Sequence, residues 1–453
     1  MWWHKERPQN WPATTKYAPR ISVEKESTMN DLLALPASEL VRRISHREIS
    51  AEAVVRACTE RILAGDTHLH AWQFFDPALA LAQARACDAG SASGALHGLP
   101  IGVKDLMDTA DMPSTYGSPI YATHRPVTDA AVVALSRAEG AIVMGKTVTT
   151  EFATFKPGPT CNPRAPVDQP HTPGGSSSGS AAAVAAGMVP LAFGSQTAGS
   201  IVRPAAYCGI VGYKPTHGTL PLAGIKSLSP SLDTVGVLAR SVDDAAFFVG
   251  VLARLPLHAF AHGRLRIGVC QTPHWDRAGT DSRAALLRTA RLLEQAGAVL
   301  TDLILPDACT GLTAAQIDIM GYEAHAAFAP ELNLHAADLS APFAALLKSG
   351  KAVDGQRFFA AQKLASGARL AVDALFNHVD IVLAPSTEGE APAGIGATGD
   401  PIFNRLWTLL GNPCVHVPTG LGSTGMPIGV TLIGPRWGDA QTIAAARALE
   451  RQL

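Results

Sequence analysis

The sequence predicts an α/β fold in which a large sheet is covered by helices. Short apolar segments alternate with longer amphipathic segments over residues 96–146 and again after residue 264, and such alternation is typical of a sheet covered by helices. The chain has 453 residues, whereas single hydrophobic cores stop growing at roughly 250–300 residues. We therefore expect either one large sheet or two lobes. Hydrophobic residues make up 47% of the chain, which is enough to build such a core.

Helices are expected over residues 30–90. Ser50 is a suitable N-cap, because its side-chain oxygen can accept from the free N–H groups of the first turn. Asp76-Pro77 opens another helix with proline at the first helical position. Gly90 is expected to end that helix.

The following segments alternate between strand and helix. The apolar run 99–103 predicts a short buried strand that ends at Lys104. Residues 129–138 predict a helix stopped by Gly140, and residues 141–144 predict a second buried strand. After residue 264, the expected strands cover 265–270, 299–305, 381–384 and 427–433, and the expected helices cover 281–296, most of 307–378 and 439 to the end.

Charge and cysteine usage exclude several classes of protein. Lys and Arg total 37 and Asp and Glu total 38, with no long basic tract, so we expect no nucleic-acid partner. The seven cysteines are scattered and form no CxxC pair, which argues against a disulfide framework or a zinc site. The longest apolar stretch, residues 181–193, contains a glycine and a proline and is too short to span a bilayer.

The first 28 residues differ from the rest of the chain. Residues 1–28 are polar and lack the apolar segment of a secretory signal. We expect them to form a flexible extension ahead of one domain at 29–453, in a cytoplasmic protein. Met29 is an alternative start.

Residues 156–236 are dense in Gly, Ser, Thr and Pro but keep runs of small apolar residues. A flexible linker would lack those runs, so we expect tight turns within a core, where catalytic groups tend to lie. Ser200 follows the small-residue turn Thr197-Ala198-Gly199. Such a turn can direct several backbone N–H groups at one point, as an oxyanion hole requires. The alternative is a glycine-rich turn whose serine bonds its own backbone.

Two further residues suit acid–base chemistry. Lys104 closes a buried strand, and burial lowers the pKa of a lysine towards values at which it can act as a base. The alternative is a strand-end lysine that reaches water. Ser176 follows two glycines, and its hydroxyl can both donate and accept a proton. The alternative for this serine-rich stretch is a loop or an anion-binding nest.

Taken together, these segments resemble the amidase signature family. The run 173–187, with its Pro-Gly-Gly-Ser-Ser-Ser-Gly-Ser-Ala core, is similar to the signature, as are 196–209 and 212–216. The resemblance extends from about residue 30 to the end, with a core at 96–240 and the thinnest match over 307–378. The matches on either side of the signature run are 100–105, 145–147, 151–153, 231–236, Arg240, Asn412-Pro413, Pro418, Gly420 and 427–430.

The resemblance implies a Ser–cisSer–Lys triad at Ser200, Ser176 and Lys104, with a cis peptide bond between Gly175 and Ser176. It implies that neutral Lys104 takes the proton of Ser176 while Ser176 takes that of Ser200. Ser200 then attacks the carbonyl, and water later hydrolyses the acyl-enzyme. The fold it implies is a large mixed sheet covered by helices on both faces.

The resemblance also implies an oxyanion hole, made by the N–H groups of Thr197, Ala198, Gly199 and Ser200. The family usually has Gly-Gly before the nucleophile, whereas this chain has Ala198-Gly199, so a methyl group narrows the acyl site or perturbs one N–H. No metal or organic cofactor is implied, and we expect activity to survive chelators. The expected substrate is a small amide, a carbamate (urethane) or a carboxylated amide. A homodimer is a further expectation.

Arg203 is a candidate for substrate binding. It lies three residues after Ser200, in the Ser-x-x-Arg-Pro spacing of malonamidase-like members, and an arginine can bind a substrate carboxylate bidentately. The alternative is a structural arginine that bonds backbone carbonyls. Ser177 and Ser195 are further candidates. We expect specificity to depend on 307–378 and on loops 112–127 and 154–170, with Tyr116, Phe155, Met320, Tyr322 and Trp407 as candidate lining residues.

Two other functions compete with this hypothesis. Residues 175–179 also satisfy the G-x-S-x-G pattern of an α/β-hydrolase elbow, which would make Ser177 the nucleophile of an esterase. Such an elbow should follow a strand, and residues 172–174 are a poor strand. The other alternative is an amidotransferase-type subunit that works only within a complex.

Overall fold

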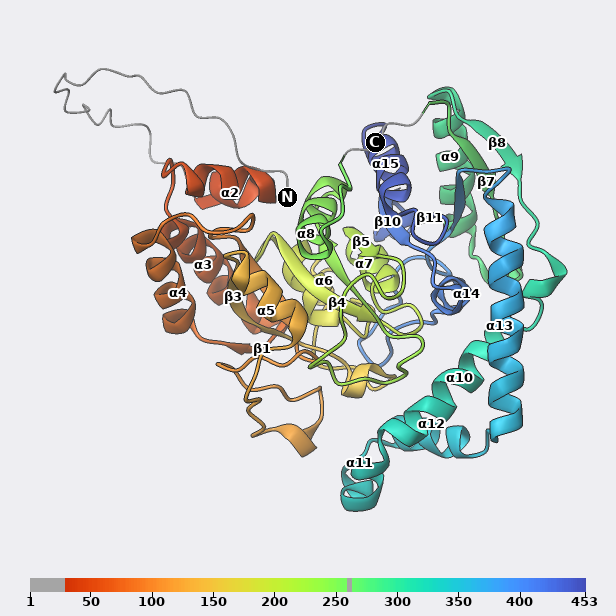
Figure 1. The fold of residues 1–453 in the computed structure, drawn as a ribbon. Coiled ribbons are helices and arrows are strands. Elements are labelled where there is room, and N and C mark those ends of the chain that lie inside the picture. Colours follow the sequence, from red (N-terminus) through yellow and green to blue (C-terminus); the bar gives the residue numbers. More distant parts are fainter. Residues whose placement is uncertain (1–28, 259–262) are drawn as a thin grey trace, which may run out of the picture.

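The computed structural model describes residues 29–258 and 263–453, so the predicted extension at 1–28 lies outside the described residues. Within the described residues, a sheet of eleven strands forms the centre of the fold (Figure 1). Across the sheet the strands are β1 (Trp72–Phe75), β3 (Ile142–Thr147), β2 (Pro100–Lys104), β4 (Leu191–Gln196), β6 (Thr234–Ala239), β5 (Val211–Lys214), β10 (Cys414–Leu421), β11 (Pro427–Ile433), β9 (Ile381–Pro385), β7 (Arg266–Val269) and β8 (Val299–Asp302).

The sheet is mixed, as predicted. Strand β2 runs parallel to both of its neighbours, β3 and β4, and β7 runs parallel to β8 and β9. The strands between these two groups pair in antiparallel fashion. The carboxyl ends of β2 and β4 therefore lie at the same edge of the sheet, which brings residues that follow them close together.

Helices surround this sheet. The α-helices of the described residues are α1 (Met29–Ala34), α2 (Ala37–Ser45), α3 (Ala51–Leu69), α4 (Pro77–Ala89), α5 (Ala131–Ala138), α6 (Ser178–Ala185), α7 (Val202–Cys208), α8 (Val242–Ala253), α9 (Thr280–Gln295), α10 (Leu312–Ala327), α11 (Ala329–Leu334), α12 (Ala341–Lys351), α13 (Gly355–Leu375), α14 (Ile402–Leu410) and α15 (Asp439–Glu450). Figure 1 shows α2, α3 and α4 at one end of the sheet and α10–α13 at the other.

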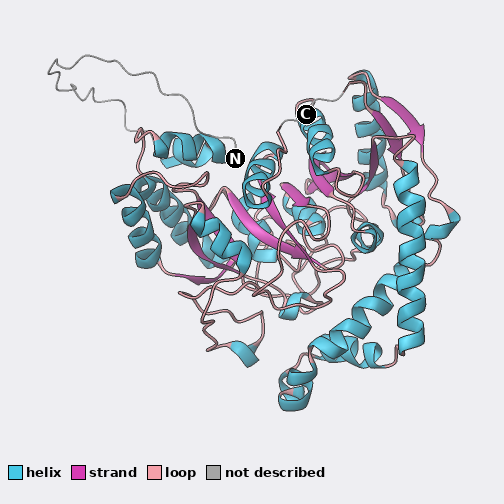
Figure 2. Cartoon of the chain, in the orientation of Figure 1, coloured by secondary structure: helices cyan, strands magenta, loops and turns pink. Residues whose placement is uncertain are grey.

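The two faces of the sheet belong to different cores. In β9, Ile381 and Leu383 join the core cluster that includes residues of α9 and α15. Val382 and Ala384 join a second cluster with residues of α10, α13 and α14. Successive strand side chains point to opposite faces, so this alternation shows that helices cover the sheet on both faces, as predicted. Figure 2 shows many of the loops gathered between the two helical ends.

Most of the predicted elements are present, with small shifts at their ends. Ser50 accepts from the Ala53 N–H and caps α3, Asp76 caps α4 with proline in its first turn, and Gly90 ends that helix. Residues 307–378 are mainly helical, as expected. No helix among the described residues is long and apolar enough to cross a membrane.

The expectation of helices alone over 30–90 is wrong at residues 72–75, which form β1. This strand has only four residues and pairs antiparallel with β3, so its formation depends on a partner that lies about 70 residues further along. The strand expected over 299–305 ends at Asp302, because its pairing with β7 stops there.

Candidate active site

Lys104 lies at the carboxyl end of β2, where the sheet positions it beside β4. The parallel register pairs Ile101 with Leu191 and Gly102 with Ala192, so continuing along both strands brings Lys104 level with Gly194, one residue before Ser195. The Lys104 ammonium nitrogen Nζ lies 2.9 Å from the Ser195 hydroxyl and 2.7 Å from the Ser176 hydroxyl. The expected contact between Lys104 and Ser176 is therefore present.

Burial changes the chemistry of this lysine. The side chain of Lys104 is fully buried, and burial lowers the pKa of Lys104 to about 7, although the Asp233 carboxylate acts in the opposite direction. Removing a cation from water disfavours its charged form. Near neutral pH, a substantial fraction of the molecules therefore carries an uncharged amine at this position. The alternative of a lysine that reaches water is wrong.

Ser176 enters the site from the loop before α6. The peptide bond between Gly175 and Ser176 is cis, which agrees with the expectation. The Ser176 carbonyl accepts from the Thr150 N–H at 3.3 Å. Helix α6 packs closely on the residue that follows β3, and only glycine fits at position 179, since a Cβ there would overlap the Val148 nitrogen. The loop is thus held on both sides of Ser176.

Ser200 lies at the turn between β4 and α7. It is almost fully buried and lines a small cavity with Thr197, Ala198 and Arg203. Within residues 29–258 and 263–453, the Ser200 hydroxyl makes no hydrogen bond. Only glycine fits at position 199 without a shift of its neighbours, since a Cβ there would lie 2.8 Å from Cβ of Pro401. The turn is therefore pressed against the segment that begins α14.

The cavity has a volume of about 20 Å³, which is the room that a single water molecule needs. Its apolar wall includes Phe155 and Met320, two of the side chains that we expected to line the site. Phe155 is 42% exposed and so lies towards solvent. The other three candidates are not among its lining residues: Tyr116 donates to Asp108, Tyr322 stacks on Phe358 and Trp407 is buried in the core.

Arg203 connects the two serine segments. One guanidinium nitrogen, Nη2, donates to the Gly175 carbonyl at 2.7 Å and to the Thr398 hydroxyl at 3.2 Å. The other two, Nε and Nη1, are buried and have no partner among the described residues. Burial lowers the pKa of Arg203 to about 10, so the group is still cationic near neutral pH. Arg203 thus has a structural contact and free donors beside Ser200.

Ser177 and Ser195 lie behind this cavity rather than in its wall. Ser177 is fully buried, and its hydroxyl accepts from the Ser195 N–H at 3.3 Å. Ser195 in turn contacts Lys104. Their predicted contact with substrate stays a prediction that this geometry does not favour. Residues 172–174 form no strand, which also disfavours an elbow at Ser177.

Two polar residues at this site escaped sequence reasoning. Gln196 accepts from the N–H groups of Ile201 and Val202 at the start of α7. Asp233 accepts from the Thr197 hydroxyl and from the segment 227–229. Both lie in segments that resemble the family, so the signal was present. A carboxylate or an amide in a turn does not by itself reveal which backbone it holds.

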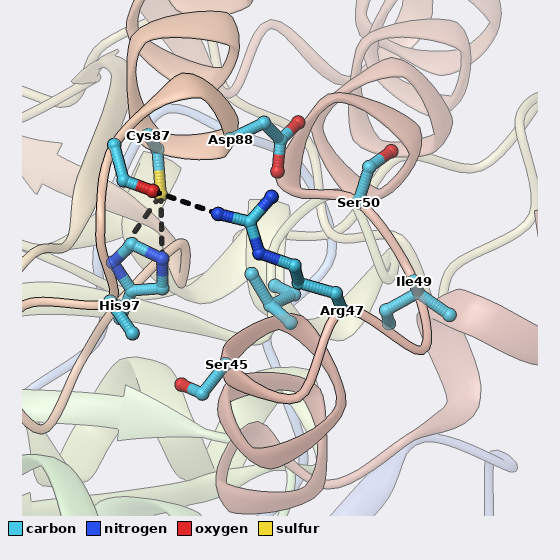
Figure 3. Close-up of a pocket in the computed structure, with 10 residues that line it drawn as sticks. Ser45, Arg47, Ile49, Ser50, Cys87, Asp88 and His97 are labelled. Atoms are coloured by element: carbon cyan, nitrogen blue, oxygen red, sulfur yellow. Dashed lines mark hydrogen bonds between the residues drawn. The ribbon is translucent and has the colours of Figure 1, made fainter. Parts of the chain in front are cut away.

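A second cavity, of about 150 Å³, lies between α2, α3 and α4 (Figure 3). It contains a thiol and an imidazole, with the Cys87 sulfur 3.5 Å from each ring nitrogen of His97. Burial raises the pKa of Cys87 to about 11, so the thiol is protonated near neutral pH, and a thiol is a much weaker nucleophile than a thiolate. Arg47 donates to the Gly90 carbonyl at 3.2 Å instead of pairing with the sulfur. This cavity does not compete as a catalytic centre.

Comparisons with known proteins agree with the fold and identify the family. Residues 53–443 match the family model described as Amidase. A glutamyl-tRNA(Gln) amidotransferase subunit of Anaeromyxobacter sp. (strain K) is 34% identical and is matched over 93% of this chain and 98% of its own length. The peptide amidase from Stenotrophomonas maltophilia has a TM-score of 0.78 and 30% identity, covering 92% of this chain and 96% of that one.

A further solved structure has a TM-score of 0.84 and 30% identity, with coverage of 92% of this chain and 98% of that one. It comes from a vestigial protein complex that bears on the evolutionary origins of an s-triazine catabolic enzyme. The matches span nearly the whole of each relative and include the sheet and the signature segments. This chain therefore belongs to the amidase family and is a serine amidohydrolase that acts on carbon–nitrogen bonds.

Proposed function

We propose that this enzyme hydrolyses a small carboxylated amide through an acyl-enzyme on Ser200, with Ser176 as the relay and Lys104 as the base. The observation that carries the proposal is the buried contact of 2.7 Å between the Lys104 amine and the Ser176 hydroxyl. The pKa of the Lys104 amine is about 7, and a general base is most effective when its pKa is close to the pH at which the enzyme operates.

The proton moves along this chain of groups in two directions. During acylation, neutral Lys104 takes the Ser176 proton and Ser176 takes the Ser200 proton, while the Ser200 oxygen forms a bond to the substrate carbonyl carbon. When the tetrahedral intermediate collapses, the proton returns to the leaving nitrogen and the carbon–nitrogen bond breaks. Water repeats the attack on the ester, which releases the acid and frees Ser200. The proposal requires the Ser176 and Ser200 hydroxyls to be in contact in the substrate complex.

The negative charge that develops on the carbonyl oxygen needs donors. The N–H groups of Thr197, Ala198, Gly199 and Ser200 are the candidates, since they belong to the turn that bears the nucleophile. Loss of one such donor typically costs about 2.7–4 kcal/mol of transition-state stabilisation. Ala198 lines the cavity, and it narrows the space available to the acyl group.

Arg203 supports a substrate that carries a carboxylate. Its two unpartnered buried nitrogens are costly in the free enzyme, because a buried donor without an acceptor loses its hydration. A carboxylate would accept from both and neutralise the charge. Since Arg203 lies one helical turn from Ser200, the carboxylate would be only a few bonds from the scissile carbonyl.

The test uses a panel of amides, carbamates and carboxylated amides with three single variants. Ser200→Ala should abolish hydrolysis of every substrate, whereas Ser177→Ala should retain it, since the Ser177 hydroxyl bonds the backbone of Ser195 rather than a catalytic side chain. Arg203→Met should lower kcat/KM for carboxylated amides about 10- to 100-fold more than for neutral amides, the scale of a lost charged contact, because the loss of the bond to the Gly175 carbonyl affects both classes alike. Full activity in Ser200→Ala would refute the role of Ser200 as the nucleophile. Equal losses in Arg203→Met on both substrate classes would refute the proposal that Arg203 binds a substrate carboxylate.

A second candidate is an amidotransferase-type subunit that delivers ammonia within a complex. It is supported by the 34% identity to a glutamyl-tRNA(Gln) amidotransferase subunit over 98% of that protein. The two candidates differ in autonomy. Steady release of ammonia or amine by the purified chain supports the amidase, and release only after addition of partner subunits supports the alternative.

A further inference from the structure

Side chains from two distant helices hold the backbone of the turn before Ser200. The Thr197 carbonyl accepts from the Gln316 side-chain amide of α10 at 3.0 Å. The Ala198 carbonyl accepts from the Thr408 hydroxyl of α14 at 2.7 Å. Gln316 and Thr408 are fully buried. Both contacts join residues more than a hundred positions apart in the sequence.

These contacts determine where the N–H groups of the turn point. A peptide unit is planar and trans, so its carbonyl and the following N–H point in opposite directions. Fixing the Thr197 carbonyl towards α10 therefore directs the Ala198 N–H away from α10. Fixing the Ala198 carbonyl towards α14 likewise directs the Gly199 N–H away from α14. Side chains on the opposite side of the turn thus orient two N–H donors that are expected to bind the oxyanion.

The orientation of Gln316 is itself determined. Arg405 donates to its side-chain oxygen at 2.6 Å, and an arginine can only donate. The Gln316 nitrogen must therefore face the Thr197 carbonyl. The Thr408 oxygen accepts from the Gln196 side-chain amide at 2.9 Å. Its single proton has two carbonyl acceptors, and that of Ala198 at 2.7 Å is nearer than that of Asn404 at 3.0 Å.

One face of α10 reaches several parts of the site. Gln316, Met320 and Glu323 are four and then three residues apart, a spacing that places them on one face. Met320 lines the cavity beside Ser200. Glu323 accepts from the Ser229 hydroxyl and the Ser231 N–H, in the loop whose residues also bind Asp233, the acceptor of the Thr197 hydroxyl. Helix α10 therefore holds Thr197 both directly and through this loop.

We propose that Gln316 and Thr408 are positioning residues that preorganise the oxyanion hole, so that a helix of the 307–378 region sets the efficiency of catalysis as well as the shape of the cavity. This role rests on the proposed function of Ser200. Neither side chain touches the reacting atoms. Their contribution is to keep two backbone donors aimed at the developing charge without reorganisation during the reaction.

The experiment compares Gln316→Met with Gln316→Glu. Methionine keeps the length of the side chain but offers no donor, and glutamate keeps the contact with Arg405 but turns an acceptor towards the Thr197 carbonyl. A matched control is Gln441→Met on α15, where the amide donates to the Asp380 carbonyl at 2.8 Å, outside both the turn and the loop that supports it. Thr408→Val removes the donor to Ala198, and Thr408→Ser restores the hydroxyl.

We expect kcat to fall by roughly 10- to 100-fold in Gln316→Met and Thr408→Val, less than the 10²–10³-fold effect of deleting a donor outright. A larger loss is expected in Gln316→Glu. KM should stay within about twofold, because ground-state binding does not depend on these donors. Thr408→Ser should recover most of kcat, and the pH profile should keep its midpoint, since Lys104 is untouched. A boronic acid that places an oxygen in the hole should lose affinity in parallel with kcat.

The proposal is overturned if both Gln316 variants keep kcat within about twofold of the parent, or if KM and boronic acid affinity change without a change in kcat. It is also overturned if Gln441→Met is as damaging as Gln316→Met at equal thermal stability. If Gln316 variants fail to fold, the Thr408 pair decides the question. Failure of the proposed function would look different, because Ser200→Ala would then remain active.

Discussion

The acid limb of the activity profile tests the role of Lys104 most directly. Burial lowers the pKa of Lys104 from 10.5 to about 7, which corresponds to a free-energy difference of about 5 kcal/mol between its two protonation states. At pH 7 about half of the molecules then carry the neutral amine, compared with roughly one in 3,000 for an ordinary lysine. The expected gain in active base is therefore on the order of 1,000-fold.

The assay is kcat/KM from pH 5 to 10 on an amide that does not ionise in this range. We expect the rate to rise about tenfold per pH unit below pH 6, to bend near pH 7 and to be constant above about pH 8. Lys104→Ala should remove the activity at every pH. Lys351→Ala, which changes an exposed lysine of α12, should keep the parent profile.

Two results would refute this reasoning. A rate that is constant between pH 5 and pH 8 would show that no group with a pKa near 7 controls the reaction. A midpoint near pH 10 would show that the lysine keeps its ordinary pKa. The same shift has a consequence for stability: the unfolded chain binds more protons than the folded chain between about pH 7 and pH 10.5, so the contribution of Lys104 to the free energy of unfolding increases with pH in this window.

Three further predictions concern a carboxylate, an ion pair and the absence of a metal from the mechanism. Asp233→Asn removes the carboxylate that raises the pKa of Lys104, so the midpoint of the pH profile should move to lower pH. The kcat should also fall, because the Thr197 hydroxyl loses a charged acceptor. An unchanged midpoint would contradict the interaction between Asp233 and Lys104. Lys146→Met leaves the fully buried carboxylate of Asp105 without its cation 3.0 Å away, so urea unfolding should show a loss of about 3–5 kcal/mol, and a loss below about 1 kcal/mol would contradict that ion pair. Incubation of the purified enzyme with a strong chelator should leave kcat unchanged; loss of activity that zinc restores would contradict a mechanism without metal.

Local sequence patterns account for much of the fold. Ser50 and Asp76 start helices because their side chains bond the first turn, an interaction that spans only a few residues. The apolar run before Lys104 forms a strand because its side chains suit burial on both faces of a sheet. The signature segments also placed the three candidate catalytic residues, since the order of small and hydroxyl-bearing residues in those turns is specific.

The tertiary structure decided the rest, because burial and pairing depend on segments that lie far apart in the chain. The sequence puts Lys104 at a strand end, but only the parallel pairing of β2 with β4 brings its amine to Ser195 and Ser176. Its lowered pKa results from desolvation by many residues together, which no local pattern encodes. The contacts of Gln316 and Thr408 with the turn before Ser200 likewise exist only once α10 and α14 have packed against it.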